Sequence, residues 1–166
     1  MLRTLRWTAV LCVVCVGTTP AWAQDKNALG RRTAFGVGLG ATYGWVGVNL
    51  EQYVVRDRVS VLVGGGYWPA GAGMSTVAGA AAARFYSHSG RHRAMFEVSY
   101  TLQSVGTTLG FGSGLSREYG PGMAAGYHFT AMSGFSFLAA LGFGWSKPGQ
   151  DVVPILALGV GHAWSY

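Results

Sequence analysis

Cysteine is missing from most of this 166-residue chain: the two cysteines are Cys12 and Cys15, and none follows them. Disulfide bonds, thiolate metal sites and a cysteine nucleophile are therefore excluded from the rest of the chain. Charged residues are also sparse, at 11%. Although 50% of the residues are hydrophobic, no segment after residue 23 has the unbroken apolar length of a membrane-spanning helix. If such a chain enters a bilayer, a closed β-barrel is the remaining solution, because every backbone polar group must be paired there.

The N-terminus has the pattern of a secretory signal peptide. Arg3 and Arg6 give a positive start, and the apolar stretch after them is too short to span a bilayer as an anchoring helix. Ala21-Trp22-Ala23 is a small-residue cleavage site. We therefore expect export through the Sec pathway and removal of this segment. The expected division of the chain is a signal peptide at 1–23, a periplasmic tail at 24–32 and a single barrel domain at 33–166.

The remaining chain alternates in hydrophobicity with the period of a β-strand. Large apolar or aromatic residues occupy every second position, and small residues occupy many of the positions between them. The final stretch shows this clearly, since Leu156, Leu158 and Val160 alternate with Ala157 and Gly159. Turn signals separate eight such segments, at 33–43, 45–54, 58–68, 76–86, 94–103, 122–130, 135–145 and 156–166.

The two faces of these segments favour a membrane barrel over a soluble β-sandwich or a lipocalin-like barrel. In a soluble fold the large face would point inward, and the other face would be polar and charged. Here the second face is small and carries few charges, so we expect the large face to contact lipid and the small face to line a narrow lumen. The connections alternate between short and long, and Ser104–Gly120 is the longest. We expect the long connections outside the cell and both termini in the periplasm.

The last segment ends on an outward-facing aromatic residue. Its large face includes Leu158, Val160, Trp164 and Tyr166. This resembles the C-terminal signal strand of bacterial outer-membrane β-barrels, in which Phe is the usual last residue. The chain looks like a small eight-stranded barrel of the OmpA/OmpX type. The resemblance implies an all-β, eight-stranded antiparallel transmembrane barrel of up-and-down topology in the bacterial outer membrane. It also implies a monomer surrounded by outer-membrane lipid and lipopolysaccharide, whose last strand is read by the barrel-assembly machinery during insertion.

Aromatic residues gather near the ends of the predicted strands. Amphipathic rings are favoured where hydrocarbon meets water, so we expect two interfacial girdles. The residues assigned to them are Tyr43, Trp45, Tyr67, Trp68, Phe85 and Trp145.

The predicted lumen contains few ionisable side chains, and we expect them to form one charge network. They are Glu51, Arg58, Arg84, Glu97 and His128. Placing Tyr86 opposite Arg93 across the fourth turn sets the register. Arg84 then lies opposite Met95 and diagonal to Glu97, within reach of a long side chain. Because buried charges must pair, we predict an Arg84–Glu97 pair that resembles the charged plug of small OmpA/OmpX-type barrels. A structural polar core, a gate on a narrow ion path and an active site are the three interpretations of this network.

An enzyme is the least supported of these interpretations. Ser99, His128 and Glu97 can be drawn as a triad, but the alternation points all three inward, whereas lipid acyl chains lie outside the barrel. His88 and His92 bracket a turn without a third ligand, so no metal is expected, and no cofactor is indicated. The basic residues are scattered, which argues against nucleic-acid binding. The leading hypothesis is a non-enzymatic outer-membrane protein that contributes to envelope integrity or surface interaction. A narrow pore and a lipid A-modifying enzyme are the alternatives.

Overall fold

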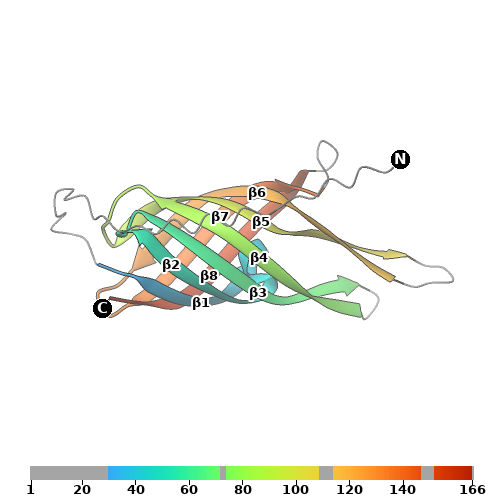
Figure 1. Cartoon of the computed structure of the whole chain (residues 1–166), viewed down its shortest axis with the longest axis horizontal. Coiled ribbons are helices and arrows are strands. Elements are labelled where there is room, and N and C mark those ends of the chain that lie inside the picture. The colour runs from blue at the N-terminus through green and yellow to red at the C-terminus, as the bar shows by residue number, and fades with distance from the viewer. Residues whose placement is uncertain (1–29, 72–73, 109–113, 147–151, 166) are drawn as a thin grey trace, which may run out of the picture.

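The chain forms a closed, eight-stranded antiparallel barrel in a computed structural model that describes residues 30–71, 74–108, 114–146 and 152–165 (Figure 1). Each strand pairs with the next, and β8 pairs with β1. The predicted all-β, up-and-down barrel is confirmed; the predicted signal peptide lies outside the described residues. The elements are β1 (Thr33–Gly40), η1 (Ala41–Tyr43), β2 (Trp45–Val55), β3 (Val59–Gly71), β4 (Met74–Tyr86), β5 (His92–Thr108), β6 (Gly114–Thr130), β7 (Phe135–Trp145) and β8 (Val152–Trp164).

The barrel has two unlike ends. The start of β1, the end of β8 and the β2–β3, β4–β5 and β6–β7 turns lie at one end, which we call the terminal end (Figure 1). At the opposite end, called the loop end, the β3–β4 and β5–β6 hairpins project beyond the other strands (Figure 1). The residues that precede β1 are held at the terminal end, because the Asp57 carboxylate accepts hydrogen bonds from the backbone amides of Gly30 at 2.7 Å and Arg31 at 3.1 Å.

Side chains alternate between an apolar exterior and a tightly filled interior. On β2, Leu50 is 51% exposed, whereas its neighbours Asn49 and Glu51 are each 3% exposed. Val63 and Leu141 are exposed in the same way on β3 and β7. An apolar belt of this extent is unusual on a water-soluble protein. The predicted outward direction of the large face is therefore confirmed.

Two strands extend well beyond their predicted boundaries. The segment Ser104–Gly120 was predicted to be a loop, but β5 continues to Thr108 and β6 starts at Gly114, with Gly106 paired to Ser116. A register shift between Leu102 and Ser104 explains the error. Such a bulge changes which side of the strand faces inward, so the simple alternation is lost although backbone pairing continues.

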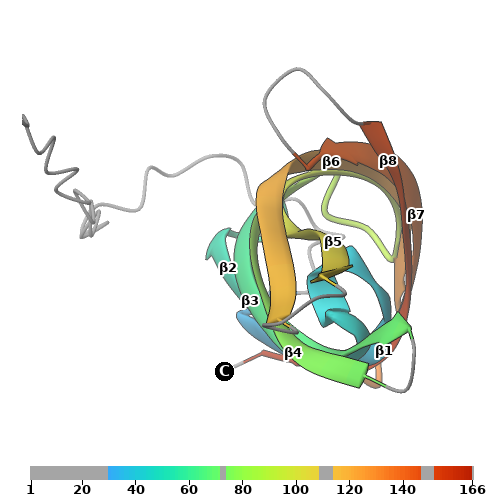
Figure 2. The same ribbon diagram turned by 90° about the vertical axis from the view of Figure 1, so that its right-hand side faces the viewer.

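The first strand is shorter than predicted. β1 ends at Gly40 rather than Tyr43, and both glycines that flank η1 have positive φ, at 110° for Gly40 and 68° for Gly44. A residue with a side chain rarely adopts these angles, so the two glycines permit the chain to turn inward. The connection between β1 and β2 thus enters the barrel instead of projecting from it (Figure 2).

Candidate functional site: the filled lumen

The η1 turn, which follows the end of β1, lies inside the barrel (Figure 2). Thr42 is fully buried and Tyr43 is 3% exposed. Glycines on the surrounding strands make room for this turn. A Cβ built on Gly64 would lie 2.0 Å from the Thr42 carbonyl oxygen, and one on Gly159 would lie 2.0 Å from the Tyr43 hydroxyl oxygen. Any larger residue at these two positions would clash with η1, so the close approach of this turn requires glycine there.

The burial of Tyr43 contradicts its assignment to an aromatic girdle. β1 ends at Gly40, so Tyr43 is not on a strand and the alternation of outward- and inward-facing side chains does not apply to it. Other proposed girdle residues do lie on the outside. Trp45 and Tyr67 are each 52% exposed near the loop end, and the Trp45 ring centroid is 5.9 Å from that of Trp68. Phe85 is exposed near the terminal end, and Trp145 is half-buried against Phe143 near the loop end.

Arg84 bridges two buried carboxylates inside the lumen. Its Nη1 atom lies 2.8 Å from Glu51 Oε2, and its Nε atom lies 2.7 Å from Glu97 Oε2. All three residues are at most 3% exposed. The predicted Arg84–Glu97 pair is confirmed, and Glu51 is a second partner from another strand. Since an Arg presents several donors in one plane, a single guanidinium can hold β2, β4 and β5 together.

The predicted register that led to this pair was wrong by two residues. Arg84 lies directly opposite Glu97, and Tyr86 faces Met95 rather than Arg93. The turn is longer than assumed. The Ser87 amide donates to the Ala94 carbonyl oxygen, and the Ala94 amide donates to the Ser87 hydroxyl oxygen. The Ser87 hydroxyl thus replaces the backbone carbonyl as the acceptor for the Ala94 amide, and the backbone pairing of β4 with β5 ends there.

Glu51 has further hydrogen-bond partners, which makes it the better satisfied of the two lumen carboxylates. The hydroxyl groups of Ser60 and Tyr86 both donate to its Oε1 atom. Glu97, in contrast, accepts only from Arg84 among the described residues. If Arg84 were lost, the buried Glu97 carboxylate would have no hydrogen-bond donor among the described residues, so its burial would cost more free energy than that of Glu51.

Arg93 is a second lumen cation, which the sequence analysis placed beside a turn and did not include in the predicted charge network. It is 1% exposed, and its guanidinium carbon lies 4.0 Å from the centre of the Tyr86 ring. It donates to the Asp57 carbonyl oxygen at 3.1 Å and to the Tyr53 hydroxyl at 3.2 Å. Arg93 lies two residues before Met95 and four before Glu97, on the same inward face of β5. This spacing is the sequence signal that could have placed it in the lumen.

His128 joins the network through Arg93 rather than through a carboxylate. Arg93 Nη2 lies 2.6 Å from His128 Nδ1. Because arginine can only donate, Nδ1 accepts this bond and the ring proton resides on Nε2. The triad drawn from Ser99, His128 and Glu97 is not assembled: among the described contacts, no hydrogen bond joins any two of these residues.

Arg58 lies outside the lumen, contrary to prediction. β2 ends at Val55, so Arg58 falls in the turn before β3, where it is exposed. Its Nη1 donates to the Ser87 carbonyl oxygen at 2.9 Å, and its Nε lies 3.3 Å from the Ser89 hydroxyl. Arg58 therefore ties two neighbouring turns together at the terminal end.

The four buried charges of this network, which we call the quartet, sum to zero. Arg84 and Arg93 contribute two positive charges, and Glu51 and Glu97 contribute two negative charges. The Tyr86 side chain connects the two halves, because its ring packs against Arg93 and its hydroxyl donates to Glu51. A quartet of this composition can remain ionised in a narrow lumen without a counter-ion.

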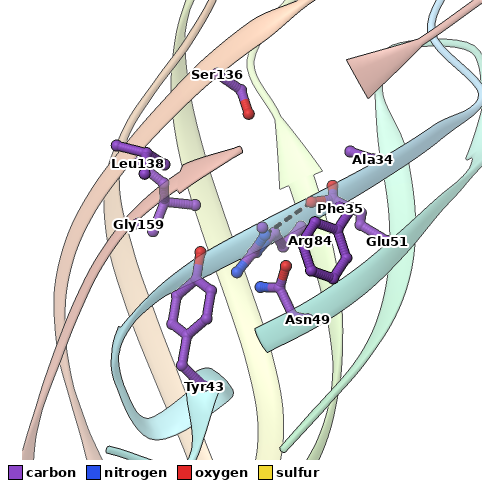
Figure 3. A pocket seen from close by; sticks show the side chains of 11 residues that line it. Ala34, Phe35, Tyr43, Asn49, Glu51, Arg84, Ser136, Leu138 and Gly159 are labelled. Carbon is purple, nitrogen blue, oxygen red and sulfur yellow. Dashed lines mark hydrogen bonds and ion pairs between the residues drawn. The ribbon is translucent and has the colours of Figure 1, made fainter. Parts of the chain in front are cut away.

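A small cavity adjoins the quartet (Figure 3). Its volume is about 20 Å³, room for about one water molecule. Arg84 and Asn49 line it, and each has one buried nitrogen without a hydrogen-bond partner among the described residues. Tyr43 points toward the same space (Figure 3). The arrangement fits a bridging water and is too small for a substrate.

The residues of the proposed assembly signal lie on the outer face of β8. Leu158, Val160 and Trp164 are exposed, at 37%, 45% and 40%. Tyr166 lies outside the described residues. The recognition of this strand by an assembly machinery stays a prediction.

Comparison with solved structures shows a likeness to the N-terminal β-barrel domain of Pseudomonas aeruginosa OprF. The TM-score is 0.62 and the sequence identity is 13%, over 81% of this chain and 99% of the OprF domain. At this identity the likeness concerns the fold, and at that level it confirms the expected resemblance to small eight-stranded barrels. No protein-family model matches the chain, and a comparison with curated proteins also gave no match.

Proposed function

We propose that this protein is a non-enzymatic outer-membrane β-barrel with a closed lumen, which contributes to envelope integrity or surface interaction. The observation that carries the proposal is the contrast between the two faces of one strand: Leu50 is half exposed on the apolar exterior, while the adjacent Glu51 is buried in an ion pair. An apolar belt around a closed barrel is suited to contact with lipid. Paired charges in the interior close the lumen to the flow of water and ions.

In this proposal the terminal end faces the periplasm and the loop end faces outward. Outer-membrane lipid would cover the apolar belt, and lipopolysaccharide would surround the projecting β3–β4 and β5–β6 hairpins. We further propose that the chain is exported through the Sec pathway and inserted as a monomer, with β8 read by the barrel-assembly machinery.

The packing of the lumen supports a structural role over the pore and enzyme alternatives. Arg84 is paired to both Glu51 and Glu97, and the buried η1 turn occupies the lumen beside them. An ion path would require these groups to separate. An acyl-chain enzyme would require room for an acyl chain or an outward-facing catalytic group, and the cavity beside Arg84, at about 20 Å³, holds about one water molecule.

The proposal is tested by purifying the protein from the membrane fraction and recording planar bilayer conductance. We expect an outer-membrane location, a mobility shift on boiling, and no stable conductance. In parallel, mass spectrometry of lipid A from cells with and without the protein should give identical spectra. A steady conductance would favour the pore, a changed lipid A the enzyme, and a soluble periplasmic location would contradict the whole proposal.

A further inference from the structure

Exposed positive charge gathers at the terminal end of the barrel. Arg32 precedes β1, Arg56 and Arg58 lie in the β2–β3 turn, and Arg91 lies in the β4–β5 turn; all four are exposed. Asp57, the acidic residue within this group, is fully buried. At this end, the part of the chain that the structure describes therefore presents cations to the surroundings without an exposed carboxylate beside them.

Most of these arginines have unused donors. The side chains of Arg32, Arg56 and Arg91 make no hydrogen bond or ion pair with another described residue. Arg58 uses Nη1 and Nε on the β4–β5 turn, which leaves its Nη2 atom available. A free guanidinium presents several N–H groups in one plane, a geometry that matches the oxygens of a phosphate group.

The arginines lie where the apolar belt ends. Val54 and Val55 are 49% and 52% exposed directly before Arg56, and Phe85 is 45% exposed on the neighbouring β4. In a membrane barrel, this boundary is the level at which hydrocarbon gives way to lipid headgroups. The charges also occupy one side of the rim, from β1 to the β4–β5 turn. The β6–β7 turn carries no arginine and instead exposes Met132, at 69%.

We propose that Arg32, Arg56, Arg58 and Arg91, together called the arginine collar, bind the phosphates of anionic phospholipid headgroups in the leaflet at the terminal end. This inference rests on the proposed membrane location. The loop end does not offer the same surface, since its described charges are the neighbouring Arg117 and Glu118. Charge attraction near a membrane surface is worth roughly fivefold in affinity per arginine.

The test measures lipid retention by native mass spectrometry. The folded barrel in non-ionic detergent is mixed with equal amounts of phosphatidylglycerol and phosphatidylcholine that have identical acyl chains. We expect the wild type to retain phosphatidylglycerol preferentially. The triple change R32Q/R56Q/R91Q removes no hydrogen bond between described residues, and it should reduce the preference by about a hundredfold if the three contributions multiply. The matched control R117Q, at the loop end, should retain the wild-type preference.

Several outcomes would overturn the inference. These are equal retention of the two lipids by the wild type, an unchanged preference in the triple variant, or an equal loss in R117Q. Adding inorganic phosphate at millimolar concentration distinguishes a general anion site, which it would saturate, from headgroup binding, which it should barely affect. Insertion into phosphatidylcholine vesicles is scored separately by the mobility shift. A barrel that inserts without a lipid preference refutes the collar alone, whereas failure to insert refutes the proposed function.

Discussion

Replacing Arg84 by methionine should destabilise the barrel more than neutralising its partner Glu97. Arg84 neutralises Glu51 and Glu97 at 2.8 and 2.7 Å, and all three residues are buried. Leaving a buried charge without its partner costs about 3–5 kcal/mol. Glu51 would keep its bonds from Ser60 and Tyr86, whereas Glu97 would keep none among the described residues. We therefore expect Arg84→Met to lower the free energy of unfolding by about 4 kcal/mol.

Glu97→Gln should be milder, because it keeps the shape of the side chain and leaves Arg84 bound to Glu51. We expect a loss of about 1.5–3 kcal/mol, the range for one hydrogen bond to a charged group. In the double variant the quartet is again neutral, since Arg93 balances Glu51. The double change should thus cost less than the sum of the single changes, by about 2 kcal/mol.

The assay is urea unfolding of the barrel in lipid vesicles, followed by tryptophan fluorescence and by the mobility shift on gels. Arg117→Gln at the exposed loop end is the control, and it should change the free energy of unfolding by at most about 0.5 kcal/mol. Strictly additive losses for Arg84→Met and Glu97→Gln would refute the reasoning, because they would mean that the two side chains do not interact in the folded barrel.

Two further predictions concern the η1 turn and the last strand. Gly159→Ala places a Cβ 2.0 Å from the Tyr43 hydroxyl oxygen, so it should lower the free energy of unfolding by about 1–3 kcal/mol in the same urea assay. Gly79→Ala is the control, because its Cβ would have its nearest neighbour at 4.0 Å, and it should have little effect. Equal effects of the two changes would contradict the packing of η1. Deleting Tyr166 should reduce the amount of heat-modifiable barrel in the outer membrane several-fold if the assembly machinery reads the last strand, and an unchanged yield would rule out that role for the residue.

The general architecture could be predicted because the alternation of large and small residues continues along most strands. On β2 and β8, for example, each outward Val or Leu marks its neighbours as inward, and the barrel closes with Val37 opposite Val160. The charged core followed from the same alternation, since Glu51, Arg84, Glu97 and His128 are all inward on their strands.

The errors arose where local geometry interrupts this alternation. Tyr43 continues the outward pattern in sequence, but positive φ at Gly40 and Gly44 turns it into the lumen. The bulge after Leu102 concealed the extension of β5. Arg93 directly follows a turn that contains Gly90 and polar residues, and this turn hides the inward alternation that Arg93 shares with Met95 and Glu97. Such features depend on backbone angles and contacts between distant strands, which a single sequence does not specify.

The most direct test of the central claim, a membrane barrel with its terminal end in the periplasm, is cysteine labelling in intact cells. Cys12 and Cys15 lie in the predicted signal peptide and no cysteine follows them, so after its removal a single introduced thiol reports one position. A membrane-impermeant maleimide should label a cysteine at position 113, between β5 and β6, and should fail to label one at Ser133 in the β6–β7 turn until the outer membrane is permeabilised. Labelling at Ser133 but not at position 113 in intact cells would contradict the account.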